Sequence, residues 1–169
     1  CSPSLPYLCI GYHQVLDSVL DVDVCSAFNL PIIRRFIGGG TALLDCNQIF
    51  YQCIFHNSRV PWRADKVYQM MLNAPVNVLN RIGLSGRLRA VNEVEANSVR
   101  IAGIGGGRVG EAMVVVGNLL LDFDYSIMSR VWNVPNQSFR DLALETMEER
   151  VGTLNKLGCN HTPESLEPY

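Results

Sequence analysis

"RRFIGGGTALLDCNQ", residues 34–48, is the stretch on which the interpretation of the fold depends. Two arginines precede three glycines, and a short apolar run ending in Asp45 follows. Glycines let the backbone approach a ligand closely, and exposed amides can hydrogen-bond phosphate or carboxylate oxygens. The guanidinium groups can pair with the same anion. The residues alone also fit a glycine-rich β-hairpin with solvated arginines, so both interpretations stay open at this point.

Apolar segments around this stretch predict strands and a long helix. Short apolar runs at residues 7–14 and 30–55 are typical of strands, and the glycines form a turn between the two parts of the second run. Between residues 64 and 82, apolar residues recur at three- and four-residue spacing. This spacing predicts a helix, which Pro75 is expected to kink or restart.

The second half of the chain predicts more strands and a last helix. Residues 88–105 predict two strands joined by an Asn-Ser turn, and the valines and leucines of residues 112–124 predict a buried strand. Asn136 or Ser138 is expected to cap a helix that ends at Gly158, and the last eleven residues look like a tail. The expected apolar face of this helix consists of Phe139, Leu142, Ala143, Met147, Val151 and Leu154.

A second glycine run raises the question of a dinucleotide site, because Gly105, Gly107 and Gly110 spell G-x-G-x-x-G. Such a fingerprint needs a helix directly after the glycines, since the helix N-terminus holds the pyrophosphate. Here a valine triplet and three leucines follow, which favour a strand. A Rossmann site is therefore not expected.

The composition favours one soluble globular domain. The chain has 169 residues, 48% of them hydrophobic and 18% charged, with a formal net charge of -2. No lysine or arginine block offers a nucleic-acid surface, and no apolar run reaches the roughly 20 residues that a membrane span needs. With no signal peptide at the start of the chain, a cytoplasmic protein without nucleic-acid or membrane partners is expected.

Cysteines and histidines give no metal-binding pattern. The six cysteines contain no C-x-x-C pair and mostly lie in apolar surroundings, which favours reduced, buried thiols. The three histidines are isolated, so a zinc site would need ligands gathered from distant parts of the chain.

Taken with its neighbours, the opening stretch resembles the R-R-x-x-G-G-G-x-x-x-H-D-x-G-N signature of the lipoate-protein ligase A family, which is related to biotin ligases and octanoyltransferases. Four further segments follow the family's order: "YLCIGYHQ" resembles V-x-I-G-x-x-Q, "NEVEANSVRIAG" resembles the N-D strand with its K-(I/V)-(S/A)-G, "VVVGNLLLDFD" resembles H-G-(T/S)-L-L-L, and "ERVGTL" resembles R-V-x-N-L. The resemblance covers roughly residues 7–157.

The resemblance implies an α+β fold with a mixed β-sheet and flanking helices, of the biotin/lipoate ligase and class II aminoacyl-synthetase type. It implies a catalytic-type domain over residues 1–157 and a C-terminal tail over 158–169. The implied activity forms an acyl-adenylate from lipoate or octanoate and ATP, with Mg²⁺, and transfers the acyl group to a lysine of a lipoyl-carrier domain. A biotin-specific member stays open, because pocket size is not legible in the sequence.

The resemblance also assigns site residues. Arg100 falls at the position of the family's lysine, which contacts the carboxylate and phosphate. Asp45 and Glu93 are candidates for holding Mg²⁺. The residues expected to line the acyl-adenylate are Arg34, Arg35, Gly38, Gly39, Gly40, Thr41, Asp45, Asn92, Gly103 and Gly117.

Several positions depart from the family pattern. Arginine keeps a positive charge at position 100 but is bulkier, planar and never a proton donor at neutral pH. Leu44-Asp45 replaces His-Asp, Asn47-Gln48 replaces Gly-Asn, Asn92-Glu93 replaces Asn-Asp, and Val116 replaces a histidine. The octanoyltransferase cysteine has no counterpart near the N-D strand, so cysteine-based acyl transfer is not expected.

Two observations favour a different class of function, a non-catalytic subunit of a lipoylation complex. One is Arg100 in place of lysine, and the other is that the chain begins near the family's second strand, without the first helix. On this hypothesis the chain is a fragment or a subunit that a second chain completes. On the family resemblance, whichever hypothesis holds, the glycines at 103–110 are expected to form a mobile loop beside an acyl-nucleotide rather than a dinucleotide turn.

Overall fold

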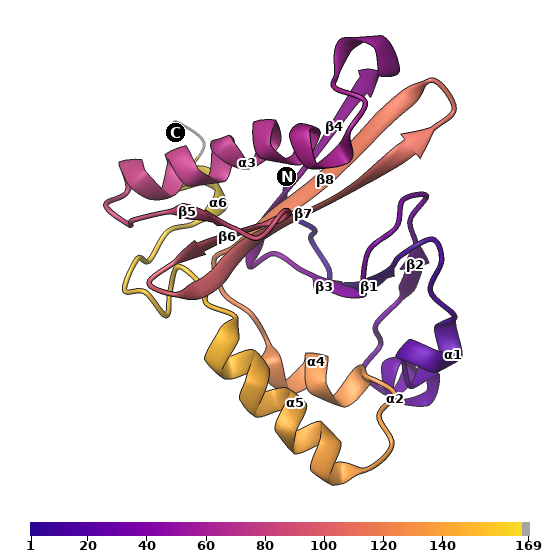
Figure 1. Ribbon diagram of the computed structural model, residues 1–169. Coiled ribbons are helices and arrows are strands. Elements are labelled where there is room, and N and C mark those ends of the chain that lie inside the picture. The colour runs from indigo at the N-terminus through magenta and orange to yellow at the C-terminus, as the bar shows by residue number, and fades with distance from the viewer. Residues whose placement is uncertain (167–169) are drawn as a thin grey trace.

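The computed structural model describes residues 1–166, which form two β-sheets flanked by helices (Figure 1). A small sheet has the strand order β2-β1-β3, and a large sheet has the order β4-β8-β7-β6-β5. Helix α3 lies on one side of the large sheet, while α1, α2, α4 and α5 lie below the small sheet (Figure 1). The expected α+β architecture with a mixed sheet is confirmed.

The small sheet consists of β1 (Tyr7–Ile10), β2 (Ile32–Arg34) and β3 (Ala42–Leu44). Strand β1 pairs in parallel with β2 and antiparallel with β3. The β-hairpin interpretation of residues 34–45 is therefore wrong. Because β2 and β3 flank β1 on opposite sides, the glycines between them cross the end of β1.

The large sheet is antiparallel throughout and consists of β4 (Gln48–His56), β5 (Arg87–Arg89), β6 (Glu93–Ala96), β7 (Val99–Val109) and β8 (Ala112–Leu120). The expected Asn-Ser turn is confirmed, since Asn97 and Ser98 both have positive φ between β6 and β7. The turn before β8 contains Gly110, whose φ is 57°.

The expectation of a mobile loop at residues 103–110 is wrong, because Gly103 to Gly107 lie inside β7. Each is paired with a residue of β8, in register from Gly103 opposite Asn118 to Gly107 opposite Val114. The valine-rich β8 is a strong strand former, and its backbone supplies the ladder that holds the glycines extended. The dinucleotide interpretation also fails, since the segment is one arm of a hairpin.

The register of β6 and β7 contains a β-bulge that decides which side chains share a face. Val94 pairs with Ala102 and Glu95 pairs with Arg100, so Ile101 has no partner on β6. The extra residue turns Arg100 to the same face as Gly103, although strict alternation would separate them. Ile101 itself is fully buried in the core.

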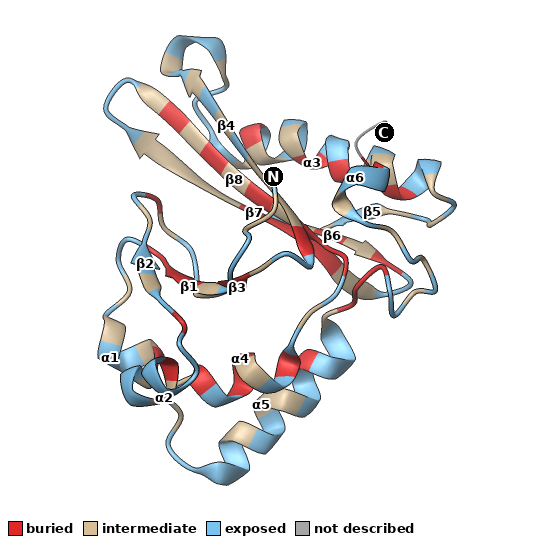
Figure 2. Cartoon of the chain, turned by 180° about the vertical axis from the view of Figure 1, so that it is seen from behind, coloured by how far each residue is buried: buried red, intermediate tan, exposed pale blue. Residues whose placement is uncertain are grey.

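The first core lies between the large sheet and α3 (Ala64–Arg81). Helix α3 follows the 3-10 helix η1 (Asn57–Arg59), and its Val67, Leu72 and Leu79 are fully buried. The helix runs unbroken through Pro75, so the expected restart there is wrong. Figure 2 shows the buried stripe of β7 and β8 that this helix covers from the other side.

The second core lies below the small sheet, among α1 (Leu16–Val19), α2 (Val22–Ala27), α4 (Tyr125–Val131) and α5 (Gln137–Arg150). Asp21, Asp124 and Asn136 cap α2, α4 and α5 by accepting backbone N–H hydrogen bonds. The sequence analysis expected the cap of α5 but not α1, α2 or α4, whose apolar runs are too short for helical periodicity.

The expected course of the last long helix is partly wrong. Helix α5 ends at Arg150, and Gly158, with a φ of 80°, lies in a later turn. Phe139 and Leu142 are 55% and 58% exposed rather than core-facing, and Met147 is the buried residue of the helix. The core contacts shift to Leu154 beyond the helix end, because an extended segment reaches the large sheet there.

The residues after Gly158 pack against the first core. Helix α6 (Pro163–Leu166) places Leu166 in that core at 4% exposure, and Cys159 packs beside it. Residues 167–169 of the expected tail lie outside the described residues.

All six cysteines are free, but only Cys9 and Cys25 are buried. Cys1 and Cys46 are exposed, so the expectation of buried thiols is correct for Cys9 and Cys25 alone. No helix within residues 1–166 has the length and apolarity needed to cross a membrane.

Candidate active site

Arg35 organises the segment we call the glycine loop, residues 35–41. Its Nε and one terminal nitrogen donate to the Gly38 carbonyl at 3.2 and 3.0 Å, and that terminal nitrogen also donates to Gly40 O at 2.7 Å. The other terminal nitrogen donates to the Cys9 carbonyl at 3.1 Å. A guanidinium with all three nitrogens engaged fixes the loop against β1, because no rotation satisfies the same acceptors.

Gly11 and Gln14, which follow β1, contact the glycine loop, and Arg34 at the end of β2 contacts the turn beside it. The Gln14 side-chain oxygen accepts from Gly11 N at 2.8 Å and from the Thr41 hydroxyl at 3.2 Å. Gly11 has no room for a Cβ, which would collide with the Gly39 carbonyl. One nitrogen of Arg34 donates to three carbonyls of residues 11–14, at 2.7 to 3.0 Å. Arg34 therefore shapes the neighbouring turn.

The peptide N–H groups of residues 38–41 are hydrogen-bond donors of the loop that have no partner among the described residues. While the carbonyls of Gly38 and Gly40 bond Arg35, none of these four N–H groups donates a hydrogen bond within residues 1–166. Gly39 has a φ of 104°, a conformation that favours glycine. A run of unpaired N–H groups in such a turn is a ready site for phosphate or carboxylate oxygens.

Strand β7 carries the glycine face that meets this loop. A Cβ on Gly105 would lie 3.8 Å from the Gly38 carbonyl oxygen, and a Cβ on Gly107 would lie 3.6 Å from Ile37. A Cβ on Gly103 would collide with the guanidinium of Arg100. Gly103, Gly105 and Gly107 share one face of β7, so the Arg100 guanidinium and the glycine loop adjoin the same bare strip of backbone.

Arg100 is half-buried beside Glu93. Its Nε lies 3.1 Å from a carboxylate oxygen of Glu93, an ion pair without the angle of a hydrogen bond. Neither terminal nitrogen of Arg100 donates a hydrogen bond to another of residues 1–166. The backbone of Arg100 is fixed, since its carbonyl accepts from Gly152 N at 2.7 Å. Arg100 is thus a positioned cation with free donors.

The family becomes clear from the whole chain. Residues 4–168 match the model of the lipoyl protein ligase A/B catalytic domain. The chain belongs to this family. The resemblance stated from the glycine-rich signature is confirmed.

Curated relatives share the family at low identity. The chain is 26% identical over 155 residues to lipoate-protein ligase A subunit 1 of Thermoplasma acidophilum, covering 86% of this chain and 58% of that protein. It is 24% identical to octanoyltransferase LipM of Clostridioides difficile, covering 89% of this chain and 64% of that protein. The chain therefore spans less than two thirds of these relatives.

Solved structures share the fold. A bi-partite lipoate protein ligase from Thermoplasma acidophilum, described with its E2 lipoyl domain, superposes with a TM-score of 0.88 at 24% identity, over 96% of this chain and 64% of that one. A lipoate-protein ligase A bound with ATP gives 0.78 at 22% identity, over 96% and 65%. A biotin protein ligase from Aquifex aeolicus gives 0.52 at 10%, over 71% and 45%.

Three expected site residues lie at the margin of this arrangement. Asn92, before β6, accepts from Ile104 N with its carbonyl at 3.0 Å, and its side chain donates to Ile104 O at 3.4 Å. Asp45 accepts from Asn47 N at 2.9 Å and so caps the turn after β3. Gly117 pairs with Tyr51 and Ile104 on the face that α3 covers, opposite to Gly103. Their roles as ligand contacts stay predictions.

The candidate Mg²⁺ residues do not form a built metal site. Asp45 bonds the Asn47 turn, and Glu93 lies within ion-pair distance of Arg100 and Arg89. Within residues 1–166, no group of three or more His, Cys, Asp or Glu side chains is placed to hold a metal ion.

Tyr51 lies where no Cβ on Gly117 could fit. Its hydroxyl is buried without a hydrogen-bond partner among the described residues, and burial raises the pKa of Tyr51 from 10.0 to about 12, with Cys53 adding to the shift. A neutral phenol in an apolar surrounding is the stable form, because ionisation would leave an unsolvated charge.

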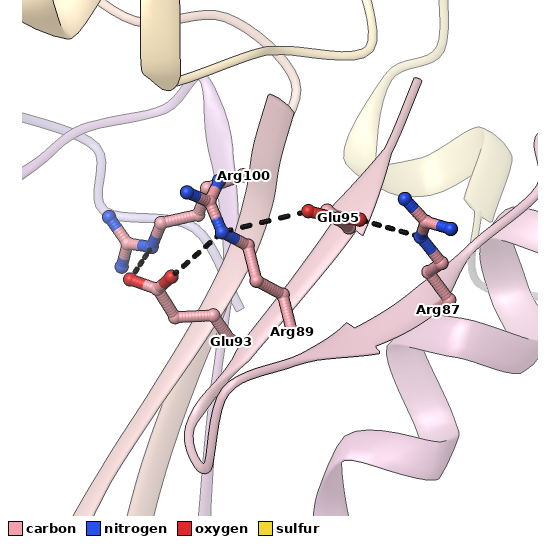
Figure 3. Close-up of polar contacts among 5 residues, drawn as sticks. All are labelled: Arg87, Arg89, Glu93, Glu95 and Arg100. Atoms are coloured by element: carbon pink, nitrogen blue, oxygen red, sulfur yellow. Dashed lines mark hydrogen bonds and ion pairs between the residues drawn. The ribbon is translucent and has the colours of Figure 1, made fainter. Parts of the chain in front are cut away.

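Sequence reasoning named Glu93 only as a candidate for holding Mg²⁺, and it missed the other charged side chains that accompany Arg100. Arg87, Arg89, Glu93 and Glu95 share its face of the sheet and form ion pairs across β5, β6 and β7 (Figure 3). Their alternation in "RLRAVNEVE" is a period-two signal that could have found them. Sequence reasoning also did not predict that the Gln14 side chain connects Gly11 with Thr41, although Gln14 was part of the quoted family motif.

Two surface cavities lie away from this arrangement. One of about 550 Å³ is lined by residues of α2, α4 and α5, including Phe28 and Arg130. Another of about 420 Å³ lies beside α3 and Leu88. Neither contains a residue of the glycine loop or of β7, so the candidate site rests on the arrangement of donors.

Proposed function

We propose that this chain is a catalytic domain of the lipoate-protein ligase type, which binds lipoyl- or octanoyl-adenylate and attaches the acyl group to a lysine of a lipoyl-carrier domain. One observation carries this proposal: the free terminal nitrogens of Arg100 and the unpaired N–H groups of residues 38–41 adjoin one bare glycine strip of β7. Family membership supports the chemistry assigned to that arrangement.

In the first half-reaction, a carboxylate oxygen of lipoate attacks the α-phosphorus of ATP, an acyl-phosphate bond forms, and pyrophosphate leaves. Negative charge gathers on the α-phosphate oxygens as the new bond forms. Arg100 and the N–H groups of the glycine loop stabilise this charge without reorganising, because the ion pair with Glu93 and the Arg35 hydrogen bonds already hold them. The absence of a side chain at Gly105 lets the substrate approach the backbone there, next to the Arg100 guanidinium that covers Gly103.

In the second half-reaction, the ε-amine of the carrier lysine attacks the acyl carbonyl carbon, an amide forms, and AMP leaves. A guanidinium does not take part in proton transfer at neutral pH, so Arg100 contributes only its N–H donors and its charge. Its role is therefore to stabilise the phosphate of the departing AMP. A lipoyl-carrier domain as partner is supported by the related ligase described with its E2 lipoyl domain.

A second candidate is a binding subunit that needs another chain for turnover. The ion pair between Arg100 and Glu93 favours this reading, because a carboxylate at 3.1 Å offsets part of the positive charge that catalysis would use. The description of the Thermoplasma ligase as bi-partite is consistent with a second chain.

Native mass spectrometry distinguishes the two. The purified chain is incubated with ATP, Mg²⁺ and lipoate or octanoate, and the mass of a retained acyl-adenylate is sought. A retained adenylate formed from ATP supports the catalytic domain. Retention of preformed lipoyl-adenylate alone supports the binding subunit, and retention of neither contradicts both.

A further inference from the structure

We propose that Glu93 is a positioning residue that holds Arg100 by its Nε and so presents the two terminal guanidinium nitrogens to the anionic group of the substrate. The inference rests on the proposed function for the identity of that group, a phosphate or carboxylate. It assigns a reason for arginine at this position and names the residue on which the arginine depends.

The geometry places the carboxylate on one side of the guanidinium only. Glu93 lies opposite Gly103 in the β6–β7 register, and the bulge at Ile101 brings Arg100 to the same face. The Glu93 oxygen lies 3.1 Å from Nε of Arg100. The other end of the guanidinium lies over Gly103, where it excludes a Cβ. The Nε end is paired with Glu93, and a terminal nitrogen lies over Gly103, the first glycine of the strip.

Glu93 is itself held in place by further charges. Its second oxygen lies 3.9 Å from Nε of Arg89, which in turn lies 3.6 Å from Glu95. Glu95 is 12% exposed at its side chain and lies 2.6 Å from Arg87. Figure 3 shows these five side chains as an alternating row that leads from the sheet edge to Arg100. The three inner members of the row, Glu95, Arg89 and Glu93, each lie between two opposite charges, which limits the freedom of Glu93.

Only an arginine can pair with Glu93 through one nitrogen and still present two further nitrogens to a second anion. Its five N–H donors lie on three nitrogens, so a carboxylate at Nε leaves the two terminal nitrogens for another anion. A lysine has a single charged nitrogen, and the same carboxylate would draw that nitrogen toward itself. In this chain Glu93 therefore assists an arginine and would compete with the substrate for a lysine.

The test is a double-mutant cycle on the full chain, with calorimetric titration of preformed lipoyl-adenylate. The variants are Glu93→Gln, Arg100→Lys and the combination of both. In the arginine background, Glu93→Gln is expected to weaken binding by roughly three- to tenfold, because the fork loses its anchor. In the lysine background, the same substitution is expected to strengthen binding by a similar factor, because the ammonium is released.

Opposite signs in the two backgrounds support the proposal, and equal signs overturn it. Glu95→Gln serves as a charge-matched control one pair further along the row, and it is expected to change affinity less than Glu93→Gln. An equal or larger effect of the control would show general loss of charge rather than positioning, and it would contradict the proposal.

A second readout needs no ligand. The Nε–H resonance of Arg100, assigned in a ¹⁵N NMR spectrum through its loss in Arg100→Lys, is expected to shift in Glu93→Gln. An unchanged resonance overturns the ion pair and the proposal with it. If the wild-type chain binds no adenylate, the proposed function fails, and this resonance still decides whether Glu93 positions Arg100.

Discussion

The same tripeptide, Gly-Gly-Gly, occurs twice in this chain and adopts two different structures. Gly38 to Gly40 form an irregular loop with a φ of 104° at Gly39, and Arg35 bonds its carbonyls. Gly105 to Gly107 form an extended strand whose every residue pairs with β8. Glycine permits both, so the surroundings decide: an arginine that satisfies loop carbonyls in one case and a valine strand in the other.

The difference matters for the proposed function, in which the two triplets contribute to opposite halves of the proposed site. The N–H groups of the loop triplet donate no hydrogen bond within residues 1–166, whereas the backbone of the strand triplet is paired with β8, and Gly105 and Gly107 leave the face toward the loop without side chains. The first half depends on a particular backbone conformation and the second on available space. Substitutions that add only a methyl group should separate these two kinds of dependence.

The largest effect is expected where the loop crosses the end of β1. Gly11→Ala places a Cβ against the Gly39 carbonyl, where backbone rather than a side chain must move. We expect a loss of about 3 kcal/mol in the free energy of unfolding, at the upper end of overpacking costs. Urea denaturation followed by circular dichroism measures it. The matched variant Gly40→Ala meets nothing within 4 Å and should change stability by less than about 0.5 kcal/mol; equal losses would contradict the packing argument.

The next effect concerns Arg35. Arg35→Lys keeps the charge but cannot reach the Gly38, Gly40 and Cys9 carbonyls together, since a single ammonium replaces three nitrogens. A loss of about 2 kcal/mol in stability is expected, in the range of hydrogen bonds to charged groups. Retention of lipoyl-adenylate in native mass spectra should also fall, because the loop N–H groups lose their orientation. Unchanged stability would mean that the glycine loop holds its shape without this residue.

Within the strand triplet, neighbouring glycines should respond differently to the same change. A Cβ on Gly106 would lie 2.8 Å from the Val114 carbonyl oxygen and 3.0 Å from the Tyr68 ring, whereas a Cβ on Gly107 would lie at an ordinary 3.6 Å from Ile37. Gly106→Ala is expected to lower the melting temperature, with a cost of about 1–2 kcal/mol, and Gly107→Ala to leave it nearly unchanged. A larger loss in Gly107→Ala than in Gly106→Ala would show that the face of β7 assigned to each glycine is wrong.

These contrasts explain how far the sequence could predict the structure. The apolar runs that became β1 and β8 and the apolar spacing of α3 could be predicted, because local pattern and tertiary position agree there. The family signature located Arg35 and the glycine loop. The strand was predicted only as far as Gly105, and its continuation through Gly106 and Gly107 was not, since glycine has low strand propensity and only pairing with β8 fixes it.

The partners of the site residues were less predictable than the residues themselves. Arg34 and Arg35 were expected at an anion, but their hydrogen bonds go to main-chain carbonyls, apart from one contact of Arg35 with the Cys9 sulfur, and a motif cannot reveal such partners. The ion pair of Arg100 depends on a bulge at Ile101, and a bulge shifts register by one residue without a clear sequence mark.

The smallest expected effect lies on β4, at Tyr51, which covers Gly117 of the neighbouring strand β8. Tyr51 and Tyr125 both have a pKa raised to about 12, chiefly by burial, but only the Tyr125 hydroxyl has a partner, donating to Val151 O at 2.8 Å. Removing an unsatisfied buried hydroxyl should cost nothing, so Tyr51→Phe is expected to leave stability unchanged or raise it by up to about 1 kcal/mol at pH 7, whereas Tyr125→Phe should lower it by about 1 kcal/mol.

The pH dependence gives Tyr51 a second, independent signature. A phenol whose pKa is higher in the folded state holds its proton there more tightly, so folding stability is complete below pH 10, the unfolded value, and falls as the pH rises toward 12. Tyr51→Phe removes this contribution and should flatten the decline in urea midpoint between pH 10 and 12. A decline as steep as that of the wild type would mean that the Tyr51 hydroxyl reaches water, and that Gly117 is covered less tightly than the packing of its ring implies.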